Sequence, residues 1–162
     1  MASAAQIAKE LAAAVSAMVA DAMLRAHAAV TAATPKDTTH AASNWLLSVG
    51  HPRTEVVGSR QSVDWSQWSA GRDELVRYDI KQGRVYLRNN VPYIGALNHG
   101  WSKQASAGFV ERAISGAGSQ ALPAGQKRSG AKILRKLATS SIRRGGRTRG
   151  FRGVNSRDLR GT

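Results

Sequence analysis

The sequence predicts one domain that mixes helices with short strands and is followed by a basic arm. Three observations support this: apolar residues at helical spacing near the N-terminus, strict alternation of polar and apolar residues at 84–88, and positive charge gathered near the C-terminus. A chain of 162 residues can bury one core of ordinary size but not two independent ones. We therefore expect residues 1–118 to form the domain and residues 119–162 to form the arm.

The first element is a long helix. Ser3 followed by Gln6 matches a capping box, in which the serine hydroxyl accepts a hydrogen bond from the first turn. We expect the helix to run to about Thr31, because the residue before Pro35 avoids the helical region. The apolar residues that recur at helical spacing are Ile7, Leu11, Val15, Met18 and Ala22.

A second helix and a strand are expected next. Residues 37–39 offer several N-cap side chains for a helix that ends before Gly50 and Pro52. Its apolar positions would be Ala41, Ala42, Trp45 and Leu46. The run at residues 55–58, Glu-Val-Val-Gly, predicts a short strand after it.

A third helix and a second strand complete the first ninety residues. Residues 64–78 favour a helix with an apolar face formed by Trp65, Trp68, Leu75 and Tyr78. A turn at Gln82-Gly83 leads into residues 84–88, whose period of two is typical of a half-buried strand.

The segment at residues 89–110 contains turns and short helices. Asn89-Asn90 ends the preceding strand, and Pro92 fixes a turn and removes a hydrogen-bond donor. We expect residues 93–97 to form a helical turn that residues 98–100 close, then a loop, and then a helix that starts at Ala107-Gly108.

Several classes of function lack their sequence signals. The chain has no cysteine, which excludes disulfides and thiolate metal sites, and its four histidines lack the HExxH pattern of zinc enzymes. No phosphate-binding G-x-x-x-x-G-K-[ST] run or G-x-S-x-G nucleophile motif occurs. The charged residues in the first helix also make it unsuited to span a bilayer. We expect no catalytic residues, no metal, no cofactor and no membrane.

Two linked segments resemble a known family. The first reads Thr-Pro-Lys-Asp-Thr-Thr at residues 34–39, followed by Asn44-Trp45. The second reads Asn-Asn-Val-Pro-Tyr-Ile-Gly-Ala-Leu-Asn-His-Gly-Trp-Ser-Lys-Gln-Ala-Ser-Ala-Gly-Phe-Val at residues 89–110. In this order and separation they resemble TPVDTG…NW and NNLPYA…LEYGWSKQAPAGMV of the neck and tail-completion proteins of tailed double-stranded DNA bacteriophages. These head–tail joining proteins are related to tail terminators.

The likeness covers roughly residues 5–115 and has departures. Thr39 stands where the family usually has glycine, Asn98-His99 where it has Glu-Tyr, and Ser106 where it has proline. The arm beyond Gly118 lies outside the likeness, so its role cannot be carried over. Taken alone, residues 34–38 are a proline turn before a helix cap.

The resemblance implies both a fold and a role. The fold would be α+β, with a small, mainly antiparallel sheet flanked by helices. The role would be that of a structural virion protein, forming a homo-oligomeric ring of six or twelve copies around the DNA channel at the head–tail junction. Portal or adaptor proteins would lie on one side and tail proteins on the other, and assembly would take place in the host cytoplasm.

A closed ring requires heterologous contacts, in which one surface meets a different surface of the next copy. We expect these contacts at the N-terminal helix and the loop at residues 93–104. An exposed tryptophan in such a loop is typical of an interface anchor. The candidate subunit-interface residues are Asn90, Pro92, Tyr93, Trp101, Ser102, Lys103 and Gln104.

The arm carries most of the net charge of +14. Residues 119–162 hold twelve Lys or Arg against Asp158 alone, whereas residues 1–118 hold twelve against nine acidic residues. Its Arg-Gly-rich part resembles RGG segments that bind nucleic acid, and an amphipathic stretch with Ile133, Leu134 and Leu137 favours docking on a neighbour instead. Nonspecific DNA contact and neighbour contact stay open as alternatives. The candidate contact residues are Arg143, Arg144, Arg147, Arg149 and Arg152.

Overall fold

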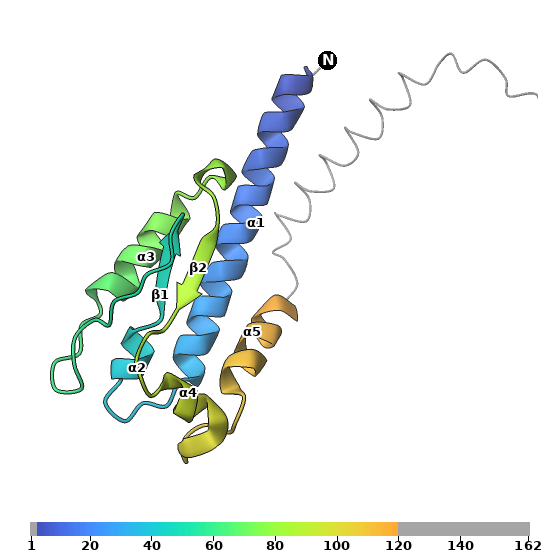
Figure 1. The fold of residues 1–162 in the computed structure, drawn as a ribbon. Helices are drawn as coiled ribbons and strands as arrows, with labels where there is room; N and C mark the ends of the chain where they lie inside the picture. Colours follow the sequence, from blue (N-terminus) through green and yellow to red (C-terminus); the bar gives the residue numbers. More distant parts are fainter. Residues whose placement is uncertain (1–2, 120–162) are drawn as a thin grey trace, which may run out of the picture.

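The computed structural model describes residues 3–119 (Figure 1). Helix α1 (Ala4–Ala33) is the longest element, and helix α5 (Phe109–Ser119) packs beside its C-terminal half in the antiparallel direction (Figure 1). Strands β1 (Leu46–Val49) and β2 (Val85–Arg88) form an antiparallel two-stranded sheet. The expected α+β fold with a long N-terminal helix is therefore confirmed. The basic arm and its candidate arginines lie outside the described residues.

Helix α1 begins and ends where its sequence predicts. The Ser3 hydroxyl accepts a hydrogen bond from the Gln6 backbone N–H at 3.2 Å, which satisfies one free donor of the first turn. The Gln6 side chain donates to Glu10. At the other end, Thr34 adopts an extended conformation before Pro35, as the steric demand of proline requires.

The predicted second helix is wrong over most of its length. Helix α2 spans only His40–Ser43, and the chain then enters strand β1. Leu46 and Leu47 are almost wholly buried, and they pair with Arg88 and Leu87 of β2. A short continuous apolar run fits a buried strand as well as a helix, and pairing with β2 decides between them here.

The predicted strand at residues 55–58 is also wrong. This segment is a loop, because the Asn44 side chain takes the backbone bonds that a neighbouring strand would otherwise make. Asn44 Oδ1 accepts from Val57 N at 2.7 Å, and Asn44 Nδ2 donates to Val57 O at 2.9 Å. Val56 is 42% exposed, so burial gives no reason for a strand either.

Helix α3 (Ser66–Val76) confirms the third predicted helix with shorter bounds. It packs against β1, and its buried residues are Gly71 and Leu75. A Cβ added at Gly71 would lie 2.5 Å from the carbonyl oxygen of Leu47, so glycine is required for this close approach of helix and strand.

The last elements follow the predicted order. A 3-10 turn (Ile80–Gln82) and Gly83, with φ of 96°, lead into β2. After β2, the short helix α4 (Ile94–Ala96) continues as a π-helical turn (Leu97–Trp101), which is one turn longer than expected. Gly108, with φ of 73°, precedes α5 at the expected place.

Candidate functional site

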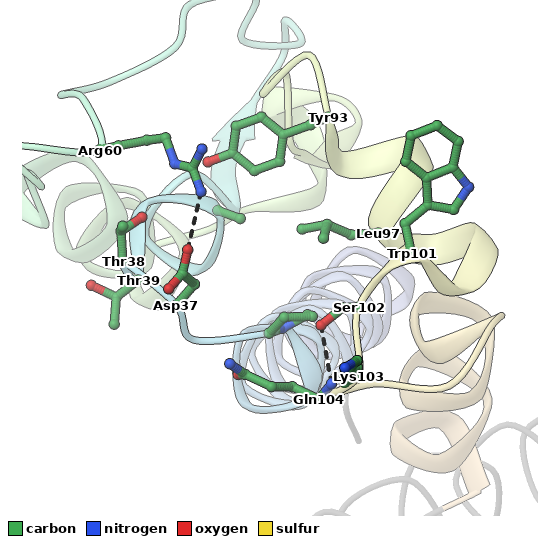
Figure 2. A pocket seen from close by; sticks show the side chains of 12 residues that line it. Asp37, Thr38, Thr39, Arg60, Tyr93, Leu97, Trp101, Ser102, Lys103 and Gln104 are labelled. Atoms are coloured by element: carbon green, nitrogen blue, oxygen red, sulfur yellow. Dashed lines mark hydrogen bonds and ion pairs between the residues drawn. The ribbon is translucent and has the colours of Figure 1, made fainter.

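The two segments that carry the family resemblance meet in space. The backbone N–H of Lys36 donates to Oε1 of Gln104 at 2.8 Å, and His40 Nδ1 lies 3.0 Å from the Tyr93 hydroxyl oxygen. Each of these bonds joins residues that are more than fifty positions apart in the chain. The fold therefore brings residues of two separate sequence motifs together around one pocket (Figure 2).

A cavity of about 320 Å³, here called the first cavity, lies between these segments (Figure 2). Side chains of the loop after α1 form one wall, and side chains of the π-helical turn and the loop after it form the other. The lining residues are Pro35, Asp37, Thr38, Thr39, Ala41, Arg60, Tyr93, Leu97, Trp101, Ser102, Lys103 and Gln104.

The first segment holds this surface in place through buried hydrogen bonds. Trp45 Nε1 donates to Thr34 Oγ1 at 2.8 Å, and Thr34 Oγ1 in turn donates to the carbonyl oxygen of Val30 at 2.6 Å. Thr34 and Trp45 are 2% and 6% exposed. An indole N–H inside a core needs an acceptor, and Thr34 supplies it. These two motif residues therefore stabilise the fold and are not available for contact with a partner.

His27 extends the same buried network below the surface. Its Nε2 donates to the carbonyl oxygen of Trp45 at 2.8 Å, and its ring lies 4.7 Å from that of Trp68. Burial lowers the pKa of His27 from its ordinary value of 6.5 to about 4, with Arg72 lowering it further and the bond to Trp45 opposing the shift. Nδ1 has no partner within residues 3–119. His27 is therefore neutral at pH 7 and part of the core.

Arg60 closes one side of the first cavity. Its guanidinium makes an ion pair with Asp37 at 3.1 Å and lies 5.4 Å from the centre of the Tyr93 ring (Figure 2). Both charged side chains are more than half exposed, so the pair contributes little to stability. The pair brings Arg60, Asp37 and the ring of Tyr93 together at the rim of the first cavity.

Trp101 is the most exposed large apolar side chain among the described residues, at 83%. It ends the π-helical turn directly after Gly100, whose φ of 91° turns the chain outward. A Cβ on Gly100 would lie 3.3 Å from Cβ of Ala107, so the loop closes tightly behind the indole. The backbone therefore presents Trp101 to solvent from a firmly packed base.

The base of this loop is tied to α5. The Asn98 side chain donates to both carboxylate oxygens of Glu111, at 2.9 and 3.0 Å, and accepts from Val110 N at 3.0 Å. The bond from Asn98 lowers the pKa of Glu111 below its ordinary value, so this carboxylate is charged at neutral pH. A negative charge thus lies at the start of α5, and the adjacent Arg112, which donates to the carbonyl oxygens of Ser106 and Ala107, adds a positive charge there.

The first cavity gathers five of the seven predicted interface residues and leaves two outside. Tyr93 and residues 101–104 line it, whereas Asn90 and Pro92 do not. Asn90 donates to the carbonyl oxygens of Arg53 and Glu55, so it supports a loop elsewhere. Arg60 was not predicted as a site residue, because it lies in a loop outside both motifs.

We expected neither a metal site nor a membrane-spanning helix, and two findings concern these features. No group of three His, Asp or Glu residues is arranged to hold a metal ion within residues 3–119. In the same part of the chain, no helix has both the length and the apolar character needed to cross a membrane. The predicted arginine contacts at residues 143–152 lie outside the described residues.

Comparisons with protein-family models, with curated proteins and with solved structures find no match to this chain. The assignment of a function therefore depends on the residues of the chain and on how the fold arranges them.

Proposed function

We propose that this chain is a structural virion protein of a tailed bacteriophage. It forms a homo-oligomeric ring at the head–tail junction that surrounds the DNA channel and connects the portal or adaptor to the tail. The observation that carries the proposal is the meeting of the two motif segments in one surface, through the bonds from Lys36 to Gln104 and from His40 to Tyr93. A merely local resemblance would not require distant motifs to be neighbours.

The conformation of Thr39 supports the proposal independently. Its φ of 59° lies in the left-handed region, which costs a β-branched residue energy and is easily adopted by glycine. This is the position at which the family sequence usually has glycine. A glycine would adopt this backbone conformation without strain, which supports the likeness at this position although the residue differs.

The exposed aromatic surface supports an assembly role. Tryptophan is enriched among the residues that dominate binding at protein interfaces, and Trp101 is 83% exposed at the edge of the first cavity. The surrounding side chains, Tyr93, Ser102, Lys103 and Gln104, supply the polar rim common at protein interfaces. We therefore place one subunit contact at the first cavity and Trp101.

Native mass spectrometry and electron microscopy of the full chain test the proposal. We expect closed rings whose mass is six or twelve times the 17.3 kDa of the chain. Addition of tail-deficient phage particles should yield the protein bound at the head vertex. A chain that stays monomeric at all concentrations and never associates with particles would contradict the proposal.

The charge distribution favours a second candidate, a nucleic-acid-binding module with an oligomerising body. The arm holds twelve basic residues against one acidic residue, and such segments bind nucleic acid by counterion release. Replacement of Arg143, Arg144, Arg147 and Arg149 by alanine separates the candidates. Loss of DNA affinity with intact tail attachment would support the module, and failed tail attachment would support a structural role for the arm.

A further inference from the structure

The N-terminal half of helix α1 carries a row of apolar side chains, here called the α1 row. Its members are Ile7, Leu11, Val15 and Met18, which recur at helical spacing. Leu11 and Met18 are 41% and 40% exposed, and they lie on the same side because seven residues make almost two turns. This half of α1 therefore presents an apolar face to solvent.

The charged side chains near the α1 row point away from it or are paired. Lys9 and Glu10 lie about 160° and 100° from Leu11 around the helix, at 3.6 residues per turn. Beyond the row, Asp21 makes an ion pair with Arg25. The row itself is uncharged, so a segment with basic residues on its outer side can cover it without burying a charge.

Helix α5 covers only the C-terminal half of α1, and α1 extends well beyond it (Figure 1). At about 1.5 Å per residue, α1 is about 45 Å long and α5 about 16 Å, which leaves roughly 28 Å of α1 past the end of α5. Leu11 and Met18 lie in this uncovered half.

The chain leaves the described fold close to the α1 row. Helix α5 ends at Ser119, beside the middle of α1, and runs towards the N-terminal end of α1 (Figure 1). Residues 120–132 can span up to about 40 Å at roughly 3.3 Å per residue, which is enough to reach every part of the row. The next residues of the sequence combine the apolar Ile133, Leu134 and Leu137 with the basic Lys132, Arg135 and Lys136.

We propose that residues 131–138 of the arm dock on the α1 row of the same chain. The three apolar side chains of this segment cover Leu11 and Met18, and its basic side chains stay in solvent. The Arg-Gly-rich end of the arm then starts from the N-terminal half of α1. The docking is a contact within one copy and does not depend on ring assembly.

The size of the α1 row favours the arm over a second copy of the chain. A stable protein–protein interface buries about 800 Å² on each partner, and four side chains, two of them half-buried, supply less than this. A tethered segment needs less area, because a short linker holds it at an effective concentration of about millimolar.

Crosslinking tests the docking, because the chain has no cysteine of its own. Leu11→Cys combined with Leu134→Cys places one thiol in the α1 row and one in the arm segment of the full chain. Isotope-labelled and unlabelled protein are mixed, and a short thiol-to-thiol crosslinker is added. Mass spectrometry then shows whether the two linked peptides come from one chain or from two. We expect links within one chain.

A matched control moves only the thiol on α1. Lys9→Cys with Leu134→Cys places it on the opposite side of the helix, where the linking rate should be about tenfold lower or less, because the tether alone favours neither side. Adding Ile133→Asp and Leu137→Asp to the test pair should abolish this difference. Adding Ser140→Asp and Ser141→Asp makes the same change in charge and should preserve it.

Three outcomes would overturn the docking. Equal rates at positions 9 and 11 would show that the arm does not select the α1 row. Links from position 11 to position 134 of another chain would assign the row to a neighbour's arm, and links between two thiols at position 11 would assign it to a second copy. A monomeric chain that gives the expected link would contradict the ring and leave the docking intact. Circular dichroism checks that every variant is folded.

Discussion

The two segments that carry the family resemblance differ sharply in exposure. In the first segment Thr34, Asn44 and Trp45 are buried, at 2%, 0% and 6%, whereas Trp101 of the second segment is 83% exposed. Trp45 donates to Thr34, and Asn44 bonds to the backbone of Val57, so these buried side chains hold the loops around them in place. The first segment therefore contributes buried polar anchors to the fold, whereas the second segment contributes the large exposed side chain.

The largest expected difference in the free energy of unfolding is between replacing Trp45 of the first segment and replacing Trp101 of the second. Trp45→Ala should reduce the free energy of unfolding by about 3–5 kcal/mol, because it opens a cavity and removes the buried indole donor to Thr34. Trp101→Ala should change it by about 0.5 kcal/mol or less. Urea unfolding followed by circular dichroism measures both. Equal losses would show that the two segments do not divide structure from surface.

Acid should destabilise the buried segment through His27. Its folded-state pKa of about 4 lies below the ordinary 6.5, so the unfolded chain binds the proton more tightly. The stability is complete above pH 6.5 and is lost as the pH falls towards 4, by roughly 3 kcal/mol at about 1.4 kcal/mol per pH unit. Unfolding midpoints of wild type and His27→Gln between pH 7 and 4 test this. The variant should be less stable at pH 7 and should lack this part of the pH dependence.

A gain in stability is expected where the first segment turns towards α2. Thr39→Gly should raise the free energy of unfolding by about 0.5–1 kcal/mol, because relief of the left-handed strain exceeds the added chain entropy. Thr38→Gly is the matched control and should lower it, since Thr38 has no positive φ. Thermal unfolding of the two variants compares them directly. A loss in both would show that Thr39 is not strained.

The smallest effect on the free energy of unfolding is expected at the rim of the first cavity. Asp37→Asn removes the exposed ion pair with Arg60 and should change the free energy of unfolding by about 0.5 kcal/mol or less. If the rim belongs to the subunit contact, the same variant should alter the salt dependence of assembly. Sedimentation at 50 and 300 mM salt measures this second property. A large loss of stability would place Asp37 with the structural residues instead.

The sequence predicted the helices well where several local signals agree. Ser3, the apolar spacing and Pro35 together set the limits of α1, and the alternation at residues 84–88 set β2. Residues 46–49 were misassigned because a four-residue apolar run carries no period of its own, and its partner β2 lies about forty residues away. Strand pairing over that distance is decided by the tertiary fold.

The candidate site was predicted in part for a similar reason. Tyr93 and residues 101–104 belong to one motif, so their neighbourhood follows from the local sequence. Arg60 reaches the first cavity from the loop before α3, and its contacts with Asp37 and Tyr93 depend on the tertiary fold. Asn90 was assigned to the surface because its role in supporting residues 53–55 depends on a contact across the fold.

The close approach of Gly71 to strand β1 affects how Trp68 and Arg72 lie beside α1. Because Gly71 has no side chain, α3 can lie directly on Leu47. The same helix carries Trp68 and Arg72 beside α1. A single added methyl group would have to lift the helix, and the indole of Trp68 would move with it. The spacing between α1 and the indole of Trp68 thus depends on a neighbouring position of the same helix, where glycine leaves room for Leu47.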